Sequence, residues 1–261
     1  MYEAVISDQL LWARAEKGVA LSVDGVFSNG IYFTFQDGSL LMLHDSLYGS
    51  LAFGAAVKNF AGQGRSLGIE PGMRAYLSAD RLSITDADVC FPVRFSPHAL
   101  PSGRIAACFQ QSAVPRAVMP EDLFSRTAAP ALDKLFLGLK TGDAAVLQDA
   151  AQGLIGLGTG LTPTYDDYLT GLLFCLHYAK LNVDALDRAV LDSLGRTNRY
   201  SAAFLRAAAE GGNFSLLADC LETGSEEALN RLLTVGSSSG HDMLAGMCAA
   251  MTFLESNKLA L

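Results

Sequence analysis

The chain has 261 residues, of which 50% are hydrophobic and 18% are charged, and its formal net charge at pH 7 is −8. A chain of this length can bury a substantial core, in one large domain or in two small ones. The acidic balance argues against nucleic-acid binding, which needs a clustered basic face, and against binding to an anionic membrane surface. We therefore expect no nucleic acid and no membrane among its partners.

The sequence also indicates a cellular compartment. Its longest apolar run, around Tyr168–Leu176, is too short to span a bilayer, and its first residues include acids and no basic stretch typical of a signal peptide. None of the five cysteines forms a C-x-x-C pair, a usage typical of reduced, buried thiols. The four histidines are scattered and predict no metal site. The expected localisation is cytoplasmic.

The first hundred residues have the pattern of β-strands. Runs rich in β-formers occupy residues 18–44 and 74–95, and the residues between them, 46–63, are punctuated by glycine and fit no single pattern. Three dipeptides typical of hairpin turns separate the first runs: Asp24-Gly25, Asn29-Gly30 and Asp37-Gly38. We predict an antiparallel β-rich N-terminal unit over residues 1–103, with a short helix at its start.

From Ile105 onward, alanine and leucine dominate and the apolar spacing becomes helical. Turn formers cluster near residues 96–120, where we place the boundary between the two parts. The predicted helices are 104–113, 120–140, 144–155, 166–180, 183–195, 198–210, 214–222, 226–235 and 240–256. The fold class is therefore α+β, with the β-rich unit followed by a mostly α-helical domain over residues 104–261.

The stretch GLGTGLTPTYDDYLTG at residues 156–171 is the most informative in the helical part. Glycines at alternate positions, Gly156, Gly158 and Gly160, leave backbone N–H groups open and permit positive φ angles. The helix that follows adds unsatisfied N–H groups and a partial positive charge, which together suit a small anion. Asp166 and Asp167, at the start of that helix, suit a cation, an amide or an ammonium group.

A later segment repeats this arrangement. Residues 237–247, SSSGHDMLAGM, align with residues 162–172, TPTYDDYLTGL. A constant offset pairs Thr162 with Ser237, Thr164 with Ser239, Asp167 with Asp242, Leu169 with Leu244 and Gly171 with Gly246. In one interpretation both are capping boxes, with Thr164 and Ser239 as N-caps. That interpretation leaves Asp166, the glycines and the hydroxyls of Thr162, Ser237 and Ser238 unexplained, so we expect the two helix starts to face one another across a ligand site.

A third cluster lies between the two repeats. Arg196–Ser201 precedes a helix that carries Arg206, and arginine suits bidentate binding of carboxylate or phosphate. The alternative is that Asn198 and Ser201 cap the helix while the arginines are solvated. His241 stands beside Asp242 and is either a general acid or base or simply exposed.

Three stretches together carry a family resemblance: GLGTGLTPTYDDYLTGLL, RTNRYSAAFLRAAAEGGNFS and VGSSSGHDMLAG. They resemble, in order and over about residues 130–256, a bacterial domain-of-unknown-function family that includes the AllH-type subunit of oxamate carbamoyltransferase. Members of that family have also been labelled carboxylases. The resemblance implies a subunit that transfers a carbamoyl group between phosphate and a small amide or carboxylate acceptor in allantoin and purine catabolism. Other subunits of such a complex are then expected partners.

The residue pattern and the resemblance give one set of candidate residues. Asp166, Asp167 and His241 are the expected catalytic residues. The expected substrate-binding residues are Gly156, Gly158, Gly160, Thr162, Thr164, Asn198, Arg199, Ser201, Arg206, Ser237, Ser238, Ser239, Gly240 and Asp242. The expected substrate is a small anion, carbamoyl phosphate or a carboxylate-bearing metabolite, and no cofactor is expected, although the acids suit Mg²⁺. Three alternatives stay open: a carboxylase-like enzyme, a non-catalytic subunit that binds a small anion, and a purely structural helical module.

Overall fold

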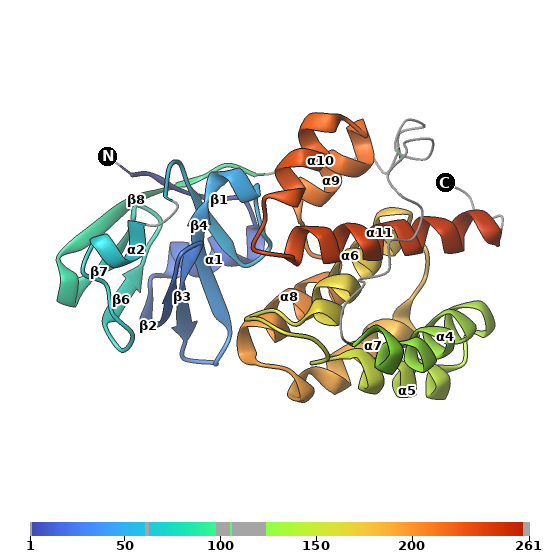
Figure 1. The fold of residues 1–261 in the computed structure, drawn as a ribbon. Helices are drawn as coiled ribbons and strands as arrows, with labels where there is room; N and C mark the ends of the chain where they lie inside the picture. Colours follow the sequence, from blue (N-terminus) through green and yellow to red (C-terminus); the bar gives the residue numbers. More distant parts are fainter. Residues whose placement is uncertain (1, 61–62, 98–104, 106–123, 258–261) are drawn as a thin grey trace. The chain divides into compact units, whose positions relative to one another are not determined.

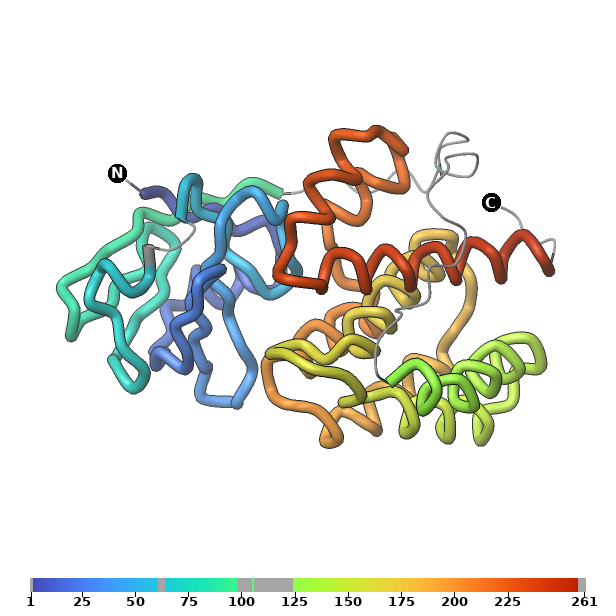
Figure 2. The backbone as a smooth tube through the Cα atoms, in the orientation of Figure 1, coloured from blue at the N-terminus to red at the C-terminus, as the bar shows by residue number. Residues whose placement is uncertain are grey.

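The structure is a computed structural model that describes residues 2–60, 63–97, 105 and 124–257 (Figure 1). The chain divides into two compact units, one formed by Met1–Leu100 with Asn213–Leu216 and the other by Pro101–Gly212 with Leu217–Leu261. Figure 2 traces the backbone of each unit in the same colours. Strands make up most of the first unit and helices make up the second.

The strands of the first unit close into a barrel in the order β1-β5-β4-β3-β2-β6-β7-β8. Their bounds are β1 Ala4–Ile6, β2 Val19–Phe27, β3 Gly30–Phe35, β4 Leu40–Asp45, β5 Gly54–Val57, β6 Arg74–Leu77, β7 Arg81–Ile84 and β8 Val89–Phe95. Most neighbours are antiparallel, but β1 pairs with β8 and β4 pairs with β5 in parallel. The prediction of an antiparallel β-rich unit is therefore wrong in detail, because the sheet is mixed and closed, while the α+β class holds.

The hairpin signals account for the barrel's first strands with one exception. The turn from β2 into β3 is Ser28-Asn29, one residue before the predicted dipeptide, because Gly30 already pairs with Phe27 in β3. Gly38, at φ 82°, lies in the turn before β4. Asp24-Gly25 makes no turn. It lies within β2, where the register with β3 shifts between Val23 and Gly25, so this dipeptide forms an irregularity of the β-bulge kind.

Inward-facing side chains of alternate strand residues fill the barrel. Ile31, Phe33, Leu41 and Leu43 are fully buried there, and the ring of Phe60 meets that of Phe91 edge-on at 5.8 Å. Short helices accompany the strands: α1 Gln9–Lys17, the 3-10 helix η1 Ser46–Tyr48, α2 Gln63–Ser66 and the 3-10 helix η2 Thr85–Ala87. The predicted short helix at the start of the chain is confirmed as α1, whose Trp12 stacks on Phe95 at 5.0 Å.

His44 and Asp45 are buried at the end of β4. His44 Nδ1 lies 2.9 Å from the carbonyl oxygen of Asp45, and since a carbonyl only accepts, Nδ1 carries the proton. The opposite ring nitrogen, Nε2, has no hydrogen-bond partner among the described residues. Burial lowers the pKa of His44 to about 4, so the ring is neutral at physiological pH.

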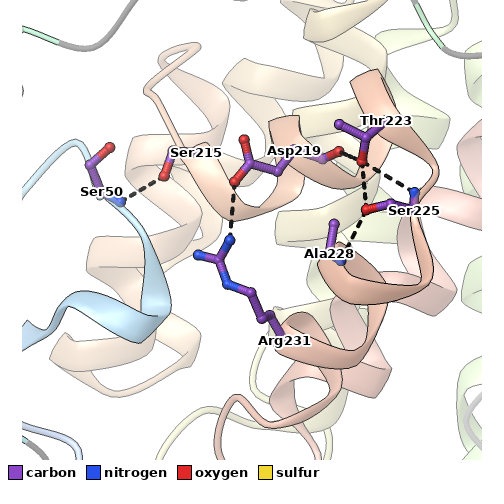
Figure 3. Close-up of polar contacts among 7 residues, drawn as sticks. All are labelled: Ser50, Ser215, Asp219, Thr223, Ser225, Ala228 and Arg231. Carbon is purple, nitrogen blue, oxygen red and sulfur yellow. Dashed lines mark hydrogen bonds and ion pairs between the residues drawn. The ribbon is translucent and has the colours of Figure 1, made fainter.

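The barrel unit also includes the short segment Asn213–Leu216. Phe214 forms an isolated antiparallel bridge with Leu51. Beside this bridge, the N–H of Ser50 donates to Ser215 Oγ at 2.7 Å (Figure 3). The N–H of Ser215 donates to the carbonyl of Ser50 at 3.0 Å. These bonds extend the barrel unit by residues distant in sequence.

The helices are α4 Ser125–Thr141, α5 Ala144–Leu154, α6 Thr164–Tyr178, α7 Asp184–Ser193, the 3-10 helix η3 Leu194–Arg196, α8 Arg199–Ala209, α9 Ser215–Thr223, α10 Glu226–Leu233 and α11 Ser239–Ser256. The predicted helices from 120–140 onward are confirmed, with ends that differ by a few residues. The helix predicted at 104–113 and the boundary at residues 103 and 104 lie outside the described residues, apart from Ile105. None of the helices in the described ranges combines the length and apolar character needed to cross a bilayer.

Polar contacts join α9 to α10. Asp219 pairs with Arg231 at 3.6 Å, and Ser225 caps α10 by accepting from the N–H of Ala228 at 3.2 Å (Figure 3). The hydroxyl of Thr223 donates to the carbonyl of Asp219 at 2.7 Å. These bonds fix the turn between α9 and α10.

The two longest apolar helices, α6 and α11, pack against each other without an intervening side chain at two points. A Cβ on Gly171 would overlap the carbonyl of Met243, and a Cβ on Gly246 would overlap the carbonyl of Tyr168. Glycine at both positions is what permits this approach. Every residue of α6 except His177 is buried, so the acidic first turn of this helix is enclosed by protein.

Candidate functional site

Asp166 is an acceptor for three different segments of the helical unit. Its Oδ1 accepts from the N–H of Gly156 at 2.7 Å, and its Oδ2 accepts from Thr197 Oγ1 at 2.5 Å and Ser201 Oγ at 2.6 Å. The residue is 1% exposed. Burial raises its pKa, and the three hydrogen bonds act in the opposite direction by stabilising the carboxylate. Asp166 therefore holds the glycine loop and the start of α8 against α6.

The glycine loop adopts the backbone that its sequence predicts. Gly156, Gly158 and Gly160 have φ angles of 82°, 127° and 97°. A Cβ on Gly156 would overlap the carbonyl of Arg196, and one on Gly158 would overlap the backbone of Thr164. The N–H of Gly156 donates to Asp166, whereas no described residue accepts from the N–H groups of Gly158 and Gly160.

Neither helix start is a capping box. Pro163 is the N-cap of α6 and Ser238 is the N-cap of α11, and neither cap makes a side-chain hydrogen bond. The prediction of Thr164 and Ser239 as N-caps is therefore wrong, since both are the first helical residues. The N–H groups of the first turn of α6 are satisfied by backbone instead, because those of Asp166 and Asp167 donate to the carbonyl of Pro163.

Asp167 lies where the two helix starts meet. Thr162 Oγ1 donates to Asp167 Oδ2 at 2.8 Å and lies 3.0 Å from Ser239 Oγ. The carboxyl is 1% exposed, and its pKa is raised to about 8, first by burial and then by the charges of Asp242 and Asp166, against the hydroxyls of Thr162 and Ser239. Asp167 is therefore protonated at neutral pH and changes charge slightly above it.

Asp242 is the counterpart of Asp167 in the first turn of α11. It is 6% exposed, and its charge acts on Asp167. Its neighbour Gly240 has a packing role, because its N–H donates to the carbonyl of Val235 and a Cβ there would overlap the carbonyl of Leu232. The two echoing segments thus converge on one cluster of acids and hydroxyls.

Several candidates lie outside this cluster. His241, Ser237 and Ser238 are exposed. Arg199 is also exposed, and Arg206 forms an exposed ion pair with Glu210 at 3.7 Å. Ser238 contacts a buried acid through its backbone only, since its carbonyl accepts from the N–H of Asp242 at 3.0 Å.

Asn198 is the N-cap of α8, as one interpretation of the sequence proposed. Its Oδ1 accepts from the N–H groups of Tyr200 at 3.0 Å and Ser201 at 3.1 Å, while its Nδ2 donates to the carbonyl of Leu161 at 2.7 Å. Ser201 does not cap, because its hydroxyl donates to Asp166. Asn198 therefore joins α8 to the end of the glycine loop.

Residues 154–251 match a family model described as oxamate carbamoyltransferase subunit AllH. These residues form an AllH-family region. The resemblance inferred from the three motifs is confirmed, and the match encloses the glycine loop, the start of α8 and the start of α11. Among solved structures, none matches the chain.

One residue of the AllH-family region was missed by sequence reasoning. Thr197 donates one of the three hydrogen bonds to Asp166, yet only its place between Arg196 and Asn198 pointed to it. A short polar side chain beside a predicted cap was the available signal. Within the described residues, no group of three or more His, Cys, Asp or Glu side chains is arranged to hold a metal ion.

Proposed function

We propose that this chain is a subunit of an oxamate carbamoyltransferase and that the junction of α6 and α11 contacts the reacting groups. The AllH-family region supports the choice of reaction, since it contains the whole junction. The observation that carries the proposal is the placement of Asp167, a buried carboxyl bound by Thr162 where two helix starts meet, whose pKa is raised by burial to about 8.

The reaction needs such a group. When a carbamoyl group passes from phosphate to the amide nitrogen of oxamate, a C–N bond forms, the C–O bond to phosphate breaks and the nitrogen loses a proton. General acid–base catalysis is most effective when the pKa of the catalyst lies near the working pH. In this proposal Asp167, as its carboxylate, takes the proton from the nitrogen, and in the reverse direction its acid form returns it.

The remaining parts of the junction have positioning and binding roles in the proposal. The N–H groups of Gly158 and Gly160, which have no acceptor among the described residues, take phosphate oxygens, because consecutive N–H groups in a turn of this kind form an anion-binding concavity. Arg199, exposed at the start of α8, takes the carboxylate of the acceptor. Asp166 is saturated by internal donors and keeps the loop in place. Mg²⁺ bound to the substrate phosphate is compatible with this arrangement.

The decisive experiment is reconstitution with the other subunits of an oxamate carbamoyltransferase, followed by an assay of carbamoyl transfer. Asp167→Asn should lower turnover at least about a hundredfold, the lower range for loss of a general acid or base. The control is Asp149→Asn, which changes an exposed carboxylate paired with Lys134. Wild-type turnover in Asp167→Asn would remove the catalytic assignment.

A thermal-shift panel on the chain alone tests the binding part. The ligands are carbamoyl phosphate, oxamate, phosphate and bicarbonate, each with and without Mg²⁺. A ligand at about a hundred times its Kd adds roughly 2.7 kcal/mol to the free energy of unfolding. Stabilisation by phosphate or carbamoyl phosphate is expected, stabilisation by bicarbonate alone favours a carboxylase-like enzyme, and binding without turnover in the complex favours a non-catalytic subunit.

A further inference from the structure

The carboxyl of Asp167 is enclosed by protein, although the proposed function requires it to exchange a proton. Asp167 is 1% exposed and belongs to the first turn of α6, a helix in which every residue except His177 is buried. A general acid or base acts on a proton within hydrogen-bond reach or through an intervening group. The side chains that contact Asp167 therefore decide how its proton is exchanged.

Two hydroxyl groups form a chain that begins at Asp167. Thr162 Oγ1 lies 2.8 Å from Asp167 Oδ2 and 3.0 Å from Ser239 Oγ. Thr162 precedes α6 and Ser239 is the first residue of α11, and both side chains are only half-buried. The chain thus connects an enclosed carboxyl to two residues that are partly exposed to solvent.

The direction of the hydrogen bonds in this chain depends on the charge of Asp167. A hydroxyl has one proton to donate and accepts hydrogen bonds as well. When Asp167 is a carboxylate, Thr162 donates to it, so Ser239 must be the donor in its contact with Thr162. When Asp167 is protonated, the same two contacts are satisfied with both donors reversed. The same three side chains therefore accommodate both charge states of Asp167.

We infer that Thr162 and Ser239 form a hydroxyl relay through which Asp167 exchanges its proton. Protons shift together along the relay: Asp167 gains the proton of Thr162, Thr162 gains that of Ser239, and Ser239 gains the proton that leaves the acceptor nitrogen. Each hydroxyl is restored, and the net change is one proton moved from the nitrogen to Asp167. This deepens the proposed function and rests on it only for the source of the proton. It also changes the expected role of Thr162 and Ser239 from binding the substrate to carrying its proton.

The first test follows Asp167 in the chain without substrate. Aspartate is labelled with ¹³C at the side-chain carboxyl, and the resonance of Asp167 is recorded through its titration in wild type, Thr162→Val and Thr162→Ser. Valine keeps the shape of threonine and removes the hydroxyl. The titration midpoint should then rise by about one pH unit or more, the effect of one hydrogen bond to a charged group. Exchange of the carboxyl proton with water should become slower, which broadens or splits the resonance.

Thr162→Ser keeps the hydroxyl and should restore both the midpoint and the exchange rate. The acids Asp166 and Asp242, whose charges raise the pKa of Asp167, are unchanged in all of these variants. Exchange at the wild-type rate in Thr162→Val would overturn the relay even if the midpoint moves, because Thr162 would then be only a static hydrogen-bond donor that joins two helix starts.

The second test uses Ser239→Ala, which leaves the contact of Thr162 with Asp167 in place and removes the outer hydroxyl. Proton exchange at Asp167 should again be slower than in wild type. The matched control is Thr252→Val, because the hydroxyl of Thr252 donates to the carbonyl of Cys248 within α11 at 2.9 Å. Wild-type exchange in Ser239→Ala would contradict the relay.

Turnover of the same variants in the reconstituted transferase links the relay to the reaction. Thr162→Val should lower turnover by roughly the hundredfold expected for loss of a general acid or base, and Thr162→Ser should recover it. Slow proton exchange combined with wild-type turnover would retain the relay and reject its use in carbamoyl transfer. Failure of the relay and failure of the proposed function are therefore seen separately.

Discussion

Asp167 illustrates how burial and neighbouring charge set the behaviour of one residue. An ordinary aspartate in the unfolded chain ionises near pH 4, whereas Asp167 in the folded chain keeps its proton to about pH 8. Between these values the unfolded state binds fewer protons than the folded state. The free energy of unfolding therefore falls as pH rises through this window, and the loss is complete above pH 8.

Asp167→Asn is expected to stabilise the protein at pH 8, since the amide stays neutral at every pH and keeps the shape of the protonated acid. The difference from wild type should be small at pH 4 and grow by up to about 1.4 kcal/mol per pH unit across the window. Urea unfolding at several pH values measures it, with Asp149→Asn as the control. A constant difference between pH 4 and pH 8 would show that Asp167 titrates normally.

Substitution of Asp166 is expected to destabilise the protein, unlike substitution of Asp167. Asp166→Ala leaves the N–H of Gly156 and the hydroxyls of Thr197 and Ser201 without their acceptor, and unpaired buried donors cost about 1–3 kcal/mol each. Thr197→Val removes one of these donors and should cost only about 1 kcal/mol. Chemical unfolding of the two variants compares the costs, and equal losses would contradict the role of Asp166 as a hub.

The sequence identified the acids of this site, but it did not predict that they make different contacts. Asp166, Asp167 and Asp242 stood out by their place at the starts of apolar helices. That Asp166 binds Gly156 while Asp167 meets α11 depends on where the loop folds back, which no local pattern encodes. The capping prediction for Ser239 failed for the same reason, because its hydroxyl lies against that of Thr162 across the junction. Thr164 is likewise the first residue of its helix, after the N-cap Pro163.

At the scale of elements, the close approach of α6 to α11 depends on the absence of a side chain at two glycines, Gly171 and Gly246. Gly171→Ala and Gly246→Ala should each destabilise the protein by about 1–3 kcal/mol, since the added methyl overlaps backbone that cannot rotate away. Gly195→Ala is the matched control, because nothing lies within 4 Å of the position its Cβ would occupy. Thermal unfolding of all three variants provides the comparison, and equal stability of all three would contradict the close packing.

The elements themselves were predictable to differing degrees. The strands predicted around Asn29-Gly30 and Asp37-Gly38, and the helices from α4 to α11, follow from local periodicity. The barrel's closure does not, because β1 reaches β8 in parallel across most of the unit and β5 lies in a stretch of small residues without alternation. Local sequence patterns predict turns, but they do not predict which distant strands pair.

At the scale of the whole molecule, the two units should respond oppositely to pH. His44 in the barrel unit has a pKa of about 4, below its usual value near 6.5, so the unfolded state binds a proton first as pH falls. The stability that His44 confers is present above about pH 6.5 and is lost as pH falls toward 4. Asp167 in the helical unit makes the opposite contribution over an overlapping range.

Two probes separate these responses. Trp12 is the sole tryptophan and lies in the barrel unit, while far-ultraviolet circular dichroism follows the helices. Between pH 4 and pH 6.5 the unfolding midpoint seen by Trp12 should rise with pH, and His44→Gln, which does not titrate, should flatten that rise. A slope in His44→Gln equal to that of wild type would show that other groups control the barrel.

The three-residue strand β1 closes the barrel. It alone joins β5 to β8, so detaching it would leave an open sheet with two bare edges. Such edges offer rows of unmatched N–H and C=O groups to any other chain, and proteins with exposed edges tend to aggregate. A fusion or affinity tag placed directly before Ala4 is therefore expected to weaken the pairing of β1 with β5 and β8. Loss of solubility in such a fusion would indicate that β1 has detached and the barrel has opened.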